Sequence, residues 1–217
     1  MLFAKDTAIA VSDSLLQVKA IKLNNKDPFT WASGMRSPIY CDNRITLSYP
    51  RIRTYIRQQF VQAIQENFGD VDVVAGVATG AIAQGALVAQ EMGLPFVYVR
   101  SESKKHGLEN LIEGHVESGQ SVVVVEDLVS TGKSSLQAVE ALRKAGCKVV
   151  GMVAIFTYQL PVATENFKKG KCKLVTLADY DSMIGRAAEN GYVKESDLDS
   201  LKEWRKDPAA WAENFKS

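Results

Sequence analysis

The sequence contains little cysteine and no long apolar run, and these absences exclude several classes of protein. Its three cysteines, Cys41, Cys147 and Cys172, are widely spaced and form no CxxC pair, so they predict neither a disulfide framework nor a thiolate metal site. No apolar stretch reaches the ~18 residues of a membrane span, and the N-terminus lacks the pattern of a signal peptide. We therefore expect a cytoplasmic, soluble protein with reduced thiols.

Neither sign of charge is in excess. The 217 residues include 26 Lys and Arg against 25 Asp and Glu, which gives a formal net charge of +1. This balance gives no reason to expect nucleic acid or a membrane surface as a partner. Histidine is scarce as well, with only His106 and His115. An anionic ligand would therefore have to be bound by a local cluster of groups.

The pattern of apolar residues predicts an α/β protein, namely a parallel twisted sheet flanked by helices. The apolar segments are continuous Val and Ile runs rather than alternating ones, which is typical of strands buried on both faces. In such a sheet the carboxyl ends of the strands meet at one edge, where ligands bind. We expect strands at Val71–Ala78, Phe96–Arg100, Ser121–Val125, Val149–Phe156 and Lys173–Leu177, and helices at Pro50–Phe68, Ala81–Met92, Ser134–Ala145 and Lys194–Phe215.

The length and the 46% hydrophobic content suit one domain spanning residues 1–217. Within it, the segment Asn24–Leu47 is rich in turn residues and aromatics and has no helical spacing. We expect a small N-terminal hood of about residues 1–48 in front of a core of about residues 49–217. Trp204, Trp211 and Phe215 are expected to pack the C-terminal helix against the rest of the chain.

The segment SVVVVEDLVSTGKSS carries the clearest chemical signal. A buried strand is followed by Glu126 and Asp127 and then by the short turn Ser130–Ser134, which opens a helix. The free N–H groups and the dipole at a helix start attract anions, the hydroxyl groups of the turn add donors, and Gly132 permits close backbone approach. This arrangement predicts a phosphate site.

Two carboxylates beside a phosphate would repel it unless they bind something else. Vicinal sugar hydroxyls donate to carboxylates, and so do waters on Mg²⁺, so the pattern favours a phosphorylated sugar with magnesium nearby. A P-loop would need glycine where Asp127 stands, which breaks that motif. An ordinary helix capped by Ser or Thr remains an open alternative.

Four segments, in this order and spacing, resemble a known family. EDLVSTGKS resembles the phosphoribosyl pyrophosphate motif of the type I phosphoribosyltransferases. FTWASGMRSPIYCDNR (Phe29–Arg44) resembles the hood of the orotate phosphoribosyltransferases, Ala75–Ala89 their pyrophosphate-binding loop with its helix, and Val99–Gly107 their mobile catalytic loop. Together the segments are specific for the orotate enzymes.

This resemblance implies transfer of phosphoribosyl from phosphoribosyl pyrophosphate to orotate with Mg²⁺, which gives orotidine monophosphate for pyrimidine synthesis. Lys104 and Asp127 would be catalytic, and no protein ligand of the metal can be named. The lid carrying Lys104 would close over the neighbouring subunit's site, so a homodimer is implied. The resemblance implies these substrate-binding residues: Arg100, Lys104, His106, Glu126, Asp127, Leu128, Val129, Ser130, Thr131, Gly132, Lys133 and Ser134.

Two alternatives stay open. The chain could transfer phosphoribosyl to another base, although its hood argues for orotate. It could instead be a regulator that senses the diphosphate with the same fold, although its near-neutral charge argues against a nucleic-acid partner. Some basic residues common in the family are absent, which leaves the orotate contacts open. The hood residues Arg36, Tyr40 and Arg44 are the candidates.

Overall fold

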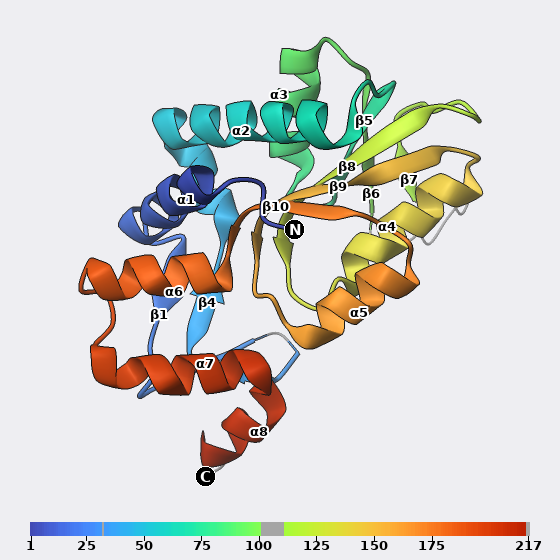
Figure 1. Cartoon of the computed structure of the whole chain (residues 1–217). Helices are drawn as coiled ribbons and strands as arrows, with labels where there is room; N and C mark the ends of the chain where they lie inside the picture. The colour runs from blue at the N-terminus through green and yellow to red at the C-terminus, as the bar shows by residue number, and fades with distance from the viewer. Residues whose placement is uncertain (32, 101–110, 216–217) are drawn as a thin grey trace.

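A six-stranded sheet forms the centre of the protein, in the computed structural model that describes residues 1–31, 33–100 and 111–215 (Figure 1). The strand order is β10-β9-β8-β5-β6-β7, and only β7 runs antiparallel to its neighbour. The predicted α/β fold with a parallel sheet is confirmed. The strands are β5 (Val73–Val77), β6 (Phe96–Val99), β7 (Ile112–Glu113), β8 (Ser121–Val129), β9 (Lys148–Thr157) and β10 (Leu174–Asp179).

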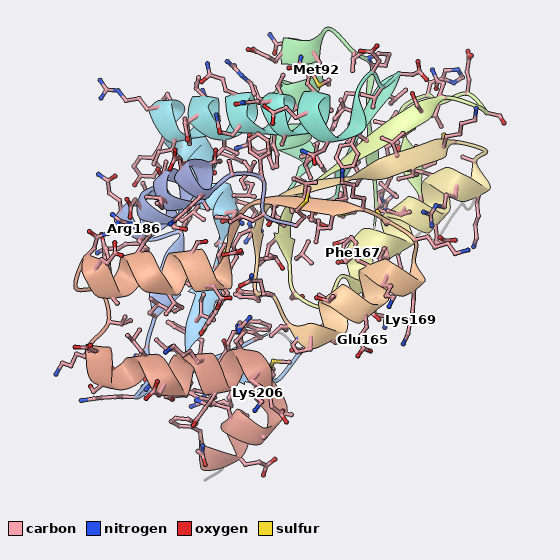
Figure 2. All side chains as sticks on the ribbon, viewed as in Figure 1. Met92, Glu165, Phe167, Lys169, Arg186 and Lys206 are labelled. Atoms are coloured by element: carbon pink, nitrogen blue, oxygen red, sulfur yellow. The ribbon has the colours of Figure 1, made fainter. Side chains whose placement is uncertain are left out.

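Helices cover both faces of this sheet, which is why its strands read as continuous apolar runs. One face packs against α1 (Lys5–Gln17), α2 (Pro50–Phe68), α3 (Ile82–Met92) and α6 (Tyr180–Glu189). The other packs against α4 (Lys133–Lys144) and α5 (Pro161–Lys169). On α5, Phe167 turns toward the sheet while Glu165 and Lys169 point outward (Figure 2). None of the helices formed by the described residues combines the length and apolarity of a membrane span.

The hood segment forms two small antiparallel pairs. β1 (Ile21–Leu23) pairs with β4 (Ile39–Cys41), and β2 (Phe29–Thr30) pairs with β3 (Arg36–Ser37). A 3-10 turn, η1 (Asn43–Ser48), then leads into α2. The hood is packed against the core by aromatic rings, since Trp31 lies 4.9 Å from Tyr158 and 5.8 Å from Trp204 between ring centroids.

The structure corrects the sequence prediction at two places. β8 does not end at Val125 but continues to Val129, so Glu126 and Asp127 lie on the strand rather than in a loop. The C-terminal helix is interrupted at Pro208, giving α7 (Leu198–Lys206) and α8 (Pro208–Ala212), because proline has no N–H and the Asp207 carboxylate accepts from the N–H of Ala210. Helices α1, α5 and α6 and strand β7 are absent from the sequence prediction.

The buried tryptophans of the C-terminal segment pack as the sequence predicts. Trp204 is fully buried, and Trp211 is buried with its ring 4.5 Å from that of Phe215. Trp204 also contacts the rings of Tyr158 and Tyr180 at 5.7 and 5.4 Å between centroids. Because Trp31 joins the same cluster, the C-terminal helices help to fix the hood.

Candidate active site

The order of the strands places a crevice between β5 and β8. From β5 the chain first adds β6 on one side and then returns to add β8 on the other, which makes this the switch point where ligands bind in such sheets. β8 pairs with β5 only as far as Gly76 opposite Val125, but it pairs with β9 as far as Val129 opposite Thr157. The edge of Glu126–Val129 that faces away from β9 therefore opens into the crevice.

A cavity of about 310 Å³ lies at this position. It brings together three segments that the sequence analysis singled out separately, namely the hood, the loop after β5 and the acidic end of β8. Its lining residues are Cys41, Asp42, Arg44, Val77, Ala78, Thr79, Gly80, Glu126, Asp127, Leu128 and Ser134.

The two acids occupy different environments. Glu126 is only 4% exposed, and its carboxylate accepts hydrogen bonds from Ser135 Oγ at 2.8 Å and from the Asp127 N–H at 2.9 Å. Burial, reinforced by the negative charge of Asp127, raises the pKa of Glu126 well above its usual range. Burial also raises the pKa of Asp127, while the guanidinium of Arg44 acts to lower it. Asp127 is thus the carboxylate available to a ligand, and Glu126 supports it from behind.

The loop after β5 approaches the Asp127 carboxylate so closely that only glycine fits. A Cβ atom built on Gly80 would overlap Oδ2 and Cγ of the Asp127 side chain. One residue earlier in this loop, the peptide bond between Ala78 and Thr79 is cis. Gly80 is therefore required by a close contact rather than by a positive φ.

The first turn of α4 lies at the other end of the cavity and leaves N–H groups uncapped by side chains of the described residues. Its N-cap is Gly132, in the left-handed region with φ 75°, and no side chain in the described part of the chain caps it. The alternative of an ordinary Ser or Thr cap is therefore wrong. Asn166 Nδ2 donates to the Thr131 carbonyl at 2.9 Å and so holds the turn. With Ser134 in the cavity wall, the free N–H groups of this turn can receive a phosphate.

The other predicted residues are distributed around this centre. Thr131 and Lys133 line a neighbouring hollow of about 660 Å³ instead of the cavity. Arg100 forms an ion pair with Glu113 at 3.2 Å and does not line the cavity, and the Val129 side chain is buried in the core. Lys104 and His106 lie outside the described residues.

Sequence reasoning missed Asn43. Its Nδ2 donates to the main-chain carbonyl of Asp127 at 2.6 Å, and its side chain is 1% exposed. An asparagine within the hood motif was the only available signal, because the partner lies 84 residues away in the sequence. This bond ties the hood directly to the acidic end of β8.

Comparison with known proteins defines the class and then the family. The family model described as the phosphoribosyl transferase domain matches residues 47–191, so the chain has the fold of a phosphoribosyltransferase. A protein of Porphyromonas gingivalis named orotate phosphoribosyltransferase is 58% identical, over 93% of this chain and 96% of its own. A protein of Listeria innocua with the same name is 52% identical, over 93% of this chain and 96% of its own. The chain belongs to the orotate phosphoribosyltransferase family.

A solved structure supports the same relationship. The orotate phosphoribosyltransferase of Aeropyrum pernix superposes with a TM-score of 0.73 at 27% identity. The match covers 85% of this chain and 99% of that one. The fold is thus shared over almost the whole of that structure.

Replacing Gly80 tests the contact with Asp127. Because a methyl group there collides with the carboxylate, we expect Gly80→Ala to weaken binding of phosphoribosyl pyrophosphate, the ligand expected from the sequence, by roughly tenfold or more in calorimetry. Gly185→Ala is the control, since a Cβ at Gly185 of α6 meets nothing within 4 Å and its affinity should be unchanged. Equal affinities for both variants would contradict the assignment.

The buried Glu126 predicts a specific pH dependence of stability. A carboxyl group whose pKa is raised in the folded state binds more protons folded than unfolded, so it costs stability increasingly as the pH rises above about 4.3. In Glu126→Gln the amide oxygen can accept from the Asp127 N–H, and Ser135 Oγ can accept from the amide, so both contacts are retained.

We therefore expect the melting temperature of Glu126→Gln to rise relative to that of the unmodified protein as the pH is raised above about 4.3. Exposed Glu195 provides the control, because Glu195→Gln should show no such trend. A difference between Glu126→Gln and the unmodified protein that stays constant with pH would show that Glu126 is not held at a raised pKa.

Proposed function

We propose that this chain is an orotate phosphoribosyltransferase, which joins orotate to the phosphoribosyl group of phosphoribosyl pyrophosphate and releases pyrophosphate in pyrimidine synthesis. The observation that carries the proposal is the switch-point cavity, where Asp127 meets the Thr79–Gly80 loop and the open first turn of α4. Relatives that bear this enzyme's name match nearly the whole chain.

The two ends of the cavity suit the two parts of the ribose phosphate. The Asp127 carboxylate accepts from the ribose hydroxyls, and Glu126 fixes the Asp127 main chain through its bond to the N–H. The ribose phosphate binds at the turn Ser130–Ser134, where the first N–H groups of α4 and the Ser134 hydroxyl donate. Leu128 forms part of the cavity wall.

The departing pyrophosphate gathers negative charge, and cationic side chains stabilise it. We assign Arg100, Lys104 and His106 to this role, as the resemblance implies. Arg100 then exchanges its bond to Glu113 for the ligand. No covalent nucleophile is required, because the reaction is a direct displacement at the anomeric carbon.

The site offers few protein ligands for a metal, which suits a magnesium ion that enters with the substrate. The described residues hold no group of three or more His, Cys, Asp or Glu side chains that could form a metal cage. Mg²⁺ commonly keeps several waters and binds through substrate phosphates plus one or two carboxylates, and Asp127 can supply one. When bound, the ion neutralises the charge of the diphosphate.

We further propose that the chain is a single domain with a hood of about residues 1–48 on a core of about residues 49–217. We also propose a homodimer in which the lid of one subunit closes over the site of the other. Water exclusion supports the lid, since the ribosyl centre would otherwise hydrolyse. A cytoplasmic location is supported by the three cysteines, which are buried and unpaired.

Turnover with orotate tests the proposal directly. With Mg²⁺ and phosphoribosyl pyrophosphate, we expect loss of orotate absorbance, no comparable reaction with a purine base, and roughly hundredfold slower turnover in Asp127→Asn. Asp199→Asn is the matched control, because that carboxylate is 92% exposed on α7. Turnover with a purine base and none with orotate would refute the proposal. Binding of nucleic acid without turnover would favour the regulator.

Mixed dimers test the shared lid. Lys104→Ala and Asp127→Asn should each turn over far more slowly than the unmodified protein, but co-expression should restore about a quarter of the activity, because half of the dimers then contain one intact composite site. Each variant expressed alone is the control. If the lid closed over its own subunit, every site in the mixture would carry a defect and no activity would return.

A further inference from the structure

We propose that Arg44 selects the acceptor by binding the carboxylate of orotate. This inference rests on the proposed function and adds the residue that distinguishes orotate from an uncharged pyrimidine. Arg44 lies on η1 of the hood, at the wall of the cavity that holds Asp127.

The charges around the cavity require such a group. Its wall contains three carboxylic acids, Asp42, Glu126 and Asp127, and Arg44 is the one cationic side chain among the described residues that line it. An anionic acceptor would be repelled by these acids unless a cation received it. The hood, rather than the Thr79–Gly80 loop or α4, supplies that cation.

The guanidinium of Arg44 is held in one orientation by Asp42, and some of its N–H donors remain available to a ligand. Its Nε donates to Asp42 Oδ1 at 2.7 Å and its Nη2 to Asp42 Oδ2 at 2.9 Å. Asp42 also accepts from the Arg44 main-chain N–H at 3.1 Å. Since a guanidinium has five N–H donors, this side-on pair leaves the Nη1 and Nη2 fork free for a second carboxylate. The Arg44 side chain is 58% exposed, so that fork is accessible.

Asn43 fixes the position of this fork relative to the ribose site. It is the neighbour of Arg44, and its Nδ2 donates to the Asp127 carbonyl at 2.6 Å while its Oδ1 accepts from Cys41 Sγ at 3.3 Å. Arg44 is close enough to Asp127 to act on its pKa against the larger effect of burial. The receptor for the base and the receptor for the ribose are thus linked by one short chain of contacts.

The test compares orotidine monophosphate with uridine monophosphate, which differ only in the carboxylate. In calorimetry, we expect Arg44→Gln to bind orotidine monophosphate roughly tenfold to a hundredfold more weakly and uridine monophosphate unchanged. The KM for orotate should rise while the KM for phosphoribosyl pyrophosphate stays the same. Arg44→Lys, which keeps the charge but loses the fork, should fall in between.

Two further variants complete the experiment. Asp42→Asn releases the guanidinium and should raise the KM for orotate while leaving that for phosphoribosyl pyrophosphate unchanged, because Asp42 acts as a positioning residue. Arg51→Gln is the matched control, since Arg51 is exposed on α2 and does not line the cavity. Its affinities for both nucleotides should equal those of the unmodified protein.

The outcomes separate this inference from the proposed function. Equal weakening of both nucleotides, or a higher KM for phosphoribosyl pyrophosphate, would overturn the inference and place Arg44 on the ribose phosphate or diphosphate. Unchanged discrimination in Arg44→Gln would overturn it as well. If the unmodified protein neither used orotate nor preferred orotidine monophosphate, the proposed function itself would fail.

Discussion

The unequal pairing of β8 is the constraint on which the site depends. Hydrogen bonds to β9 hold the strand extended as far as Val129, while β5 stops opposite Val125. The last residues of β8 therefore have a rigid backbone on one side and an open crevice on the other. A loop without such a ladder could not hold Asp127 with the same precision, because pairing with β9 restricts the backbone on both sides of this residue.

Burial of Glu126, which lies on this strand, carries an energetic cost. Glu126 is nearly inaccessible, and its pKa is raised because burial disfavours the charged form. Its two hydrogen bonds link the N–H of Asp127 to Ser135 of α4, so the acidic end of β8 and the first turn of α4 share one anchor. A raised pKa of this kind makes the folded state less stable as the pH rises, and we expect this cost to accompany the fixed geometry of the site.

The fold was largely predictable because its signals are local. Continuous Val runs predicted the parallel strands, and α2 begins at Pro50 and ends at Phe68 as its apolar spacing predicts. The end of β8 was not predictable, because acidic residues rarely occur in strands and only pairing with β9 keeps Glu126 and Asp127 extended. The break at Pro208 has a local cause, but the apolar spacing of Trp204 and Trp211 suggested a continuous helix.

The sequence by itself predicted the kind of chemistry, since the acid pair and the hydroxyl-rich turn indicated a site for a phosphorylated sugar and the hood motif added a resemblance to one family. Only the tertiary structure decided which of these groups share a cavity. It separated Asp127, which is accessible from the cavity, from Glu126, which is buried, and it placed Ser134 in the cavity wall but Lys133 outside it. It also joined Asn43 to Asp127. The physical reason is that hydrogen bonds and burial between distant segments depend on how the strands are ordered, and no local pattern of residues records that order.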